Sequence, residues 1–179
     1  DPMGPMGDQR RGLPVYGYRE RLLDTIDSNA VTVVEGETGS GKTTQVPQFL
    51  LEDAAERQVG CNIIVAQPRR ISAMSVAERV AAERGETLGS TVGYSIRLEA
   101  KASSATKLLF CTTGILLKRL EDDTDLNNVT HVFVDEVHER SIESDFLLMV
   151  LRDLLRRRNG AGTGSITSNG AGGAAAEGT

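Results

Sequence analysis

The clearest chemical signal in this sequence lies in eight consecutive residues, which read Gly36-Glu37-Thr38-Gly39-Ser40-Gly41-Lys42-Thr43. They fit the phosphate-binding pattern G-x-x-x-x-G-K-[ST] at every fixed position. The glycines let the backbone curl, so that several N–H groups point at phosphate oxygens. We expect Lys42 to reach the β- and γ-phosphates of a nucleoside triphosphate and the Thr43 hydroxyl to ligate Mg²⁺. These eight residues and Thr44 are the predicted nucleotide-binding residues.

A second signal is the acidic pair Asp135 and Glu136, which ends the apolar run of residues 129–134. Ligands of open α/β sheets bind beyond the carboxyl ends of the strands, so we expect this pair beside the metal and the γ-phosphate. Asp135 suits the metal, directly or through water. Glu136 suits the metal and also the orientation and deprotonation of an attacking water. The competing interpretation is a solvated acidic turn.

The residues around these motifs predict the elements that position them. Residues 31–34 are apolar and mostly β-branched, which predicts a buried strand leading into the loop. Residues 45–57 predict a helix, with Pro47 in its first turn, where proline is tolerated. The start of this helix would add partial positive charge beside the phosphates.

The remaining pattern alternates strands with helices, which predicts an α/β fold: a mostly parallel sheet with helices on both faces. Further strands are expected at residues 62–67 and 107–111, and further helices at residues 18–28, 72–84, 114–120 and 143–158. Residues 1–12 are rich in Gly, Pro and Met and are predicted to be disordered. Residues 159–179 form a Gly- and Ala-rich low-complexity segment, which predicts flexibility.

Four motifs in order give the sequence a specific resemblance, and a fifth stretch supports it. They are the GETGSGKTTQ block at 36–45, QPRRISA at 67–73, TTG at 112–114, DEVHER at 135–140 and, between the second and third, VGYSIR at 92–97. Over residues 13–158 the chain resembles the first RecA-like, P-loop domain of the DEAH/RHA-type (DExH-box) superfamily 2 RNA helicases. The resemblance implies ATP and Mg²⁺ as cofactors, RNA as a partner through its backbone, and a second RecA-like domain. It implies a domain incomplete at its C-terminal end.

The resemblance also assigns roles to individual residues. It implies a catalytic set of Lys42, Glu136 and His138, in which the histidine is a relay toward the second domain. It places Arg79 on the face of the adenine; a solvated helix charge is the alternative. The residues that it implies in RNA binding are Arg69, Arg70, Thr112, Thr113 and Arg97.

Each RNA assignment has an alternative that the sequence leaves open. Arg69 or Arg70 could instead pair with a carboxylate of the protein. Thr112 and Thr113 could cap the helix that follows them. Arg97 has a surface role as its alternative. For the chain as a whole, a nucleotide- and RNA-binding fragment without hydrolysis remains the alternative to an active motor, and a DNA helicase is the less favoured one.

The composition is that of one ordinary globular domain of 179 residues, 39% of them hydrophobic and 25% charged. No apolar run approaches the length of a membrane span, so no membrane partner is expected. The chain shows no signal peptide and does not begin with Met, which suggests a fragment. The net charge of −5 argues against nucleic-acid binding by bulk charge, although a groove can be locally basic. Cys61 and Cys111 are predicted to be buried thiols in a reducing compartment, hence an intracellular protein, with cytoplasm and nucleus not distinguished.

Overall fold

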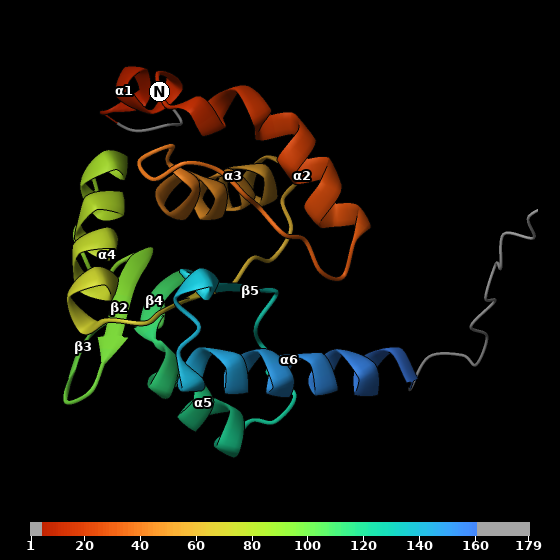
Figure 1. Ribbon diagram of the computed structural model, residues 1–179. Helices are drawn as coiled ribbons and strands as arrows, with labels where there is room; N and C mark the ends of the chain where they lie inside the picture. The colour runs from red at the N-terminus through yellow and green to blue at the C-terminus, as the bar shows by residue number, and fades with distance from the viewer. Residues whose placement is uncertain (1–4, 161–179) are drawn as a thin grey trace, which may run out of the picture.

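Five strands form one sheet in the order β3-β2-β4-β1-β5 in the computed structural model, which describes residues 5–160 (Figure 1). All neighbouring pairs are parallel except β2 and β3. The strands are β1 (Ile63–Gln67), β2 (Val92–Ile96), β3 (Glu99–Lys101), β4 (Leu108–Thr112) and β5 (His131–Val134). The predicted mostly parallel sheet is thereby confirmed.

The register of the parallel strands brings their carboxyl ends to one edge of the sheet. Gln67 at the end of β1 pairs with Thr112 at the end of β4, and Ala66 pairs with Val134 at the end of β5. β2 lies in parallel beside β4. The segments that follow these four strands therefore leave the sheet side by side, and they carry the motifs found in the sequence.

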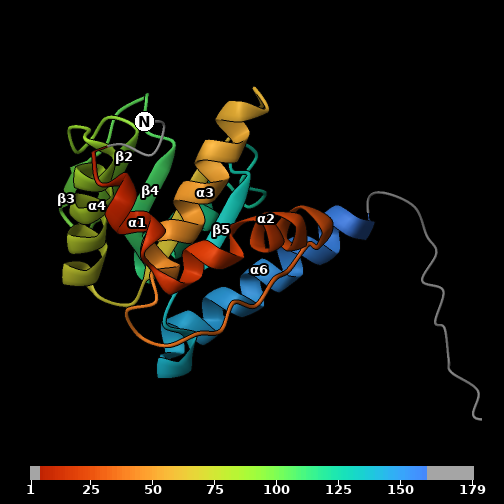
Figure 2. The same ribbon diagram turned by 90° about the horizontal axis from the view of Figure 1, so that it is seen from above.

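Helices cover both faces of this sheet (Figures 1 and 2). They are α1 (Gly7–Arg11), α2 (Arg19–Ser28), α3 (Lys42–Glu56), α4 (Arg70–Arg84), α5 (Thr113–Asp122) and α6 (Ile142–Gly160), with short 3₁₀ turns η1 (Pro14–Tyr18) and η2 (Val137–Glu139). The side chains of Ile63 and Val65 pack in the core under α3 and α4, whereas Ile64 and Ala66 pack in the core under α5 and α6. This alternation along β1 is what a central strand requires.

Most predicted elements are confirmed within a few residues of their expected bounds. Helix α4 begins two residues before its expected start and ends at Arg84, as expected. Gly85 follows it with a φ of 68° and donates its N–H to the carbonyls of Ala81 and Ala82, because glycine adopts the left-handed conformation without a Cβ penalty. In α6, Leu147 and Leu154 are buried, whereas Phe146 is half exposed.

The strand predicted at residues 31–34 does not form. Figures 1 and 2 show this segment as a coil that runs from the end of α2 to the phosphate-binding loop. Val33 is 88% exposed, and β5 is the last strand on that side of the sheet in the described part of the chain. The prediction fails because β-branched residues make a strand only where a neighbouring strand supplies hydrogen bonds and helices cover the faces.

The disorder predicted for the N-terminal segment is also wrong where that segment is described. Residues 1–4, like residues 161–179 of the predicted flexible tail, lie outside the described residues, but α1 forms and its Arg10 side chain is buried. Arg10 Nε donates to Gln45 Oε1 at 2.7 Å, and Arg10 Nη2 lies 2.6 Å from Glu52 Oε1. A buried cation needs such partners, and both belong to α3. The segment therefore packs on the helix that follows the phosphate-binding loop.

No helix within residues 5–160 combines the length and the apolar character that crossing a bilayer requires.

We expect Arg10→Ala to lower the free energy of unfolding by about 3–5 kcal/mol, because it leaves the buried Glu52 carboxylate without its closest cation. Urea denaturation measures the change. The matched control is Arg11→Ala, which removes the exposed ion pair with Asp8 and should lower the free energy of unfolding much less. Equal, small losses for both variants would show that α1 does not pack as described.

Candidate active site

The phosphate-binding loop enters α3 through two glycines in the left-handed conformation. Gly39 has a φ of 81° and Gly41 a φ of 93°. A Cβ on Gly41 would lie 3.0 Å from Leu13 Cδ1 and 3.1 Å from Val15 Cγ1. The Val15 N–H also donates to the Ser40 carbonyl at 3.1 Å. Gly41, the second fixed glycine of the motif, is therefore required by its backbone conformation and by its close packing on the segment that includes η1.

The Lys42 ammonium lies inside its own loop. Nζ donates to the Gly36 carbonyl at 2.6 Å and to the Glu37 carbonyl at 2.7 Å, and it lies 3.3 Å from Ser40 Oγ. An ammonium has three donors, so the loop occupies all of them. The lysine thus occupies the middle of the loop, and a phosphate that binds there would exchange these neutral acceptors for charged oxygens.

A cavity of about 610 Å³ opens between this loop and the N-terminal helices. Residues 36–40 and Lys42 line one side, and Tyr18, Arg21 and Thr25 line the other. Neither Asp135 nor Glu136 lines it. The loop therefore has open space on the side of α2, while its contact with the acidic pair lies elsewhere, at the first turn of α3.

That contact joins the two main motifs directly. Thr43 Oγ1 donates to Asp135 Oδ2 at 2.7 Å, across 92 residues of sequence. Asp135 Oδ1 accepts the Glu136 N–H at 2.9 Å. Asp135 Oδ2 also accepts Gln67 Nε2 at 2.7 Å, a partner that the sequence analysis missed. In the sequence, Gln67 is the first residue of the QPRRISA block and the polar residue that closes the buried run of β1, but neither feature predicts its contact with Asp135.

Glu136 begins a strained turn. Its φ is 53°, and Arg140 at the far end of η2 has a φ of 52°, both unusual for residues other than glycine. Glu136 Oε2 lies 3.1 Å from Nε2 of His138, which is exposed. The two predicted catalytic residues therefore contact each other.

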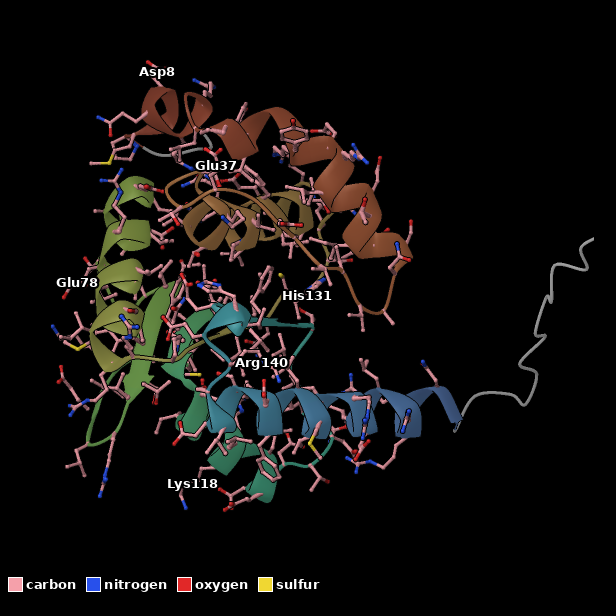
Figure 3. The ribbon with its side chains drawn as sticks, viewed as in Figure 1. Asp8, Glu37, Glu78, Lys118, His131 and Arg140 are labelled. Atoms are coloured by element: carbon pink, nitrogen blue, oxygen red, sulfur yellow. The ribbon has the colours of Figure 1, made fainter. Side chains whose placement is uncertain are left out.

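The far end of this turn is held by an ion pair. Arg140 Nη2 donates to Asp145 Oδ2 at 2.9 Å, and this hydrogen bond lowers the pKa of the Asp145 carboxyl. Figure 3 shows Arg140 where η2 leads into α6, whereas Glu37 lies in the loop near α1. The turn after the acidic pair is thus anchored to the start of α6.

For Arg69 the structure shows the pairing that the sequence left open. Arg69 Nη2 donates to Glu139 Oε1 at 2.8 Å, and the arginine side chain is 70% exposed. Arg70 begins α4 and is exposed. Both arginines follow the carboxyl end of β1, so they lie next to the acidic turn.

The two threonines of the TTG block differ from each other. Thr113 is buried, and its Oγ1 donates to the Gln67 carbonyl at 3.3 Å. The structure thus contradicts its predicted phosphate contact, because the hydroxyl points inward. Thr112 precedes α5 without a capping hydrogen bond from its side chain, so the capping alternative does not hold for it. Arg97 lies exposed in the turn between β2 and β3.

Arg79 belongs to a buried polar network. Its Nε donates to Glu83 Oε1 at 2.7 Å, while about half of the Arg79 side chain remains exposed. Glu83 is buried and accepts Gln45 Nε2 and Gln48 Nε2, each at 2.8 Å. Gln45 in turn accepts the buried Arg10. The Glu83 carboxylate therefore holds the Arg79 side chain on one side, while about half of that side chain faces solvent.

Two cysteines and one histidine outside the motifs have shifted pKa values. Both cysteines are free thiols. Burial raises the pKa of Cys111 to about 12 and also raises the pKa of Cys61. Burial lowers the pKa of His131, which lies 3.0 Å from Thr130 Oγ1. These groups stay neutral near pH 7 and lie outside the motifs.

The oxygen atoms near the loop are suitable ligands for a hard cation. A threonine hydroxyl and a carboxylate meet at the first turn of α3, and oxygen ligands are what Mg²⁺ prefers. Among the described residues no three His, Cys, Asp or Glu side chains gather into a metal cluster. Mg²⁺ in nucleotide sites needs no such cluster, because one or two carboxylates act together with the phosphates.

Comparison with known proteins agrees with this arrangement. The profile of the DEAD/DEAH box helicase family matches residues 17–159. The DExH-box ATP-dependent RNA helicase DExH1 of Arabidopsis thaliana is 58% identical over 151 residues, which are 83% of this chain and 15% of that protein. The putative ATP-dependent RNA helicase DHX57 of Homo sapiens is 57% identical over 85% of this chain and 11% of its own length. The ATP-dependent RNA helicase DHX29 of Mus musculus is 52% identical over 84% of this chain and 12% of its own. The chain thus spans only a small part of each relative.

We expect Lys42→Ala to weaken Mg-ATP binding by about 1–3 kcal/mol, the cost of losing a charge-assisted contact. Calorimetry on the chain measures the affinity. Lys118→Ala, which removes an exposed lysine of α5, should leave it unchanged. Wild-type affinity in the Lys42 variant would exclude the loop as the phosphate site.

Proposed function

We propose that this chain, which belongs to the DEAD/DEAH box helicase family, is the first motor domain of an ATP-dependent RNA helicase. The observation that carries the proposal is the 2.7 Å hydrogen bond between Thr43 Oγ1 and Asp135 Oδ2. It joins the phosphate-binding loop to the acidic pair in one site. The relatives are named as ATP-dependent RNA helicases, which supports ATP as the nucleotide and RNA as the binding partner.

Each residue of the site has a distinct role in phosphoryl transfer. The backbone of residues 36–43 holds the phosphates, and Lys42 contributes its charge to them. Thr43 and Asp135 would hold Mg²⁺, which neutralises charge on the β- and γ-phosphates when bound. Glu136 accepts the proton of the attacking water, and His138 at 3.1 Å orients its carboxylate. Arg79 offers its open guanidinium face to the base.

RNA binds at the carboxyl edge of the sheet through its sugar-phosphate backbone. Arg69 and Arg70 are exposed there, and guanidinium groups suit phosphate oxygens. Arg69 would exchange the Glu139 carboxylate for a phosphate. Thr112 ends β4 and the exposed Arg97 follows the neighbouring β2 at the same edge. Contacts of this kind carry no sequence information, so the motor would act on RNA without regard to base order.

A second RecA-like domain belongs to the proposal, because an isolated first domain lacks an arginine that reaches the γ-phosphate from the other side. An arginine of this kind contributes on the order of 10³-fold or more to phosphoryl transfer in related sites. The relatives are several times longer than the part that this chain matches. The chain alone is therefore proposed to bind nucleotide and to hydrolyse it slowly.

We expect Glu136→Gln to leave Mg-ATP affinity unchanged and to lower RNA-stimulated hydrolysis by about 10²-fold or more, because the amide keeps the size of the side chain but accepts no proton. Phosphate release is measured in a protein that continues into the second RecA-like domain. Glu121→Gln, at an exposed position of α5, is the matched control. If hydrolysis by the Glu136 variant equals that of the wild type, Glu136 is not the base that accepts the proton of the attacking water.

We expect Arg69→Ala and Arg70→Ala each to weaken RNA binding about equally for all sequences and to reduce the slope of log affinity against log salt by about 1. Filter binding over a salt series measures both quantities. Arg152→Ala, on the exposed surface of α6, should change neither. A changed sequence preference with an unchanged salt slope would indicate contacts to bases and contradict the backbone assignment.

A further inference from the structure

Gln67 has a side chain that none of the assigned roles explains. It ends β1, it is 2% exposed, and its amide points along the edge of the sheet toward β5. Gln67 Nε2 donates to Asp135 Oδ2 at 2.7 Å, as short as the bond from Thr43 to the same oxygen. A buried amide is costly unless it is paired, so this contact has a strong physical preference.

The contact completes a set of three donors around one carboxylate. Thr43 and Gln67 donate to Asp135 Oδ2, and the Glu136 N–H donates to Oδ1. A carboxylate has about four lone-pair positions, so three of them are directed by described residues. Three donors on two oxygens fix the rotation of the carboxylate about its own axis. Thr43 and Glu136 belong to the nucleotide site already, whereas Gln67 contributes only this orientation.

We propose that Gln67 is a positioning residue, which holds the Asp135 carboxylate in the orientation that receives Mg²⁺ with the nucleotide. The inference rests on the proposed function, in which Asp135 is a metal ligand. Hydrogen-bond partners of metal ligands orient those ligands, and their loss typically lowers metal affinity by about 10-fold to 100-fold. Gln67 is rigid enough for this role, because its backbone lies in the sheet and its carbonyl accepts Thr113 Oγ1 at 3.3 Å.

The measurable consequence is specific to the metal. We define the magnesium gain as the ratio of ATP affinity with Mg²⁺ to ATP affinity in EDTA, both measured by calorimetry on the 179-residue chain. Gln67→Met keeps the length of the side chain and removes its donor. We expect it to lower the magnesium gain by about 10-fold to 100-fold and to leave affinity in EDTA unchanged within about twofold.

Two controls separate positioning from a merely structural role. Gln48→Met makes the same change at another buried glutamine, which donates to Glu83 rather than to Asp135, and should keep the magnesium gain. In an Asp135→Asn background, Gln67→Met should have no further effect on the gain, since the ligand that it orients is lost. Gln67→Asn, which shortens the amide by one methylene, provides a milder variant if the methionine variant does not fold. Circular dichroism checks the fold of each.

The outcomes distinguish the inference from the function on which it rests. A full magnesium gain in a folded Gln67→Met or Gln67→Asn variant overturns the inference and leaves the proposed function in place. A loss of gain that Gln48→Met shares, or that adds to that of Asp135→Asn, also overturns it, because the effect is then one of general stability. If the wild-type chain shows no magnesium gain at all, the proposed function and the inference both fall.

Discussion

The hydrogen bond between Thr43 and Asp135 is the interaction on which the functional part of the structure depends. It connects the first turn of α3 with the end of β5, two segments that are 92 residues apart. It forms only because β5 lies in parallel beside β1, with Val134 in register with Ala66. The Asp135 N–H itself donates to the Ala66 carbonyl at 3.0 Å. The sheet therefore determines where the carboxylate stands, and the loop and its helix are oriented against it.

Local sequence patterns predicted the elements whose stability is local. The helix at α4 has apolar residues at helical spacing and a glycine stop, and both features act within the segment itself. The strand expected at residues 31–34 has an equally clear pattern, yet Val33 is exposed. A strand obtains its hydrogen bonds from a neighbouring strand that can lie anywhere in the chain. A β-branched pattern alone therefore does not determine whether a strand forms.

The motifs identified the loop, the acidic pair and Arg69, but not the partners that hold them. Gln67 belongs to the QPRRISA block, but its hydrogen bond to Asp135 becomes evident only when the sheet brings the two residues together. Arg10 lies in a Gly- and Pro-rich stretch that resembles a disordered terminus, although it is buried against α3. Buried polar side chains are satisfied by residues far away in sequence, and no spacing rule predicts such pairs. The sequence therefore predicted which residues form the loop and the acidic pair, but not the buried contacts that hold them in place.

The backbone strain in the turn that carries Glu136 costs more free energy than the surface contacts of the turn provide. Two residues other than glycine in the left-handed conformation, Glu136 and Arg140, cost on the order of 1–3 kcal/mol each. The ion pairs of Glu139 with Arg69 and of Arg140 with Asp145 lie at the surface, where such pairs contribute little to stability. Two backbone hydrogen bonds within the turn add little: the Glu139 N–H donates to the Glu136 carbonyl at 3.0 Å, and the Arg140 N–H donates to the Val137 carbonyl at 3.3 Å.

The remainder of that cost must come from the ends of the turn, which the sheet and α6 fix in place. Asp135 accepts hydrogen bonds from three donors, whereas the Glu136 carboxylate contacts His138, whose side chain is exposed. Asp135 is therefore the more firmly held member of the acidic pair.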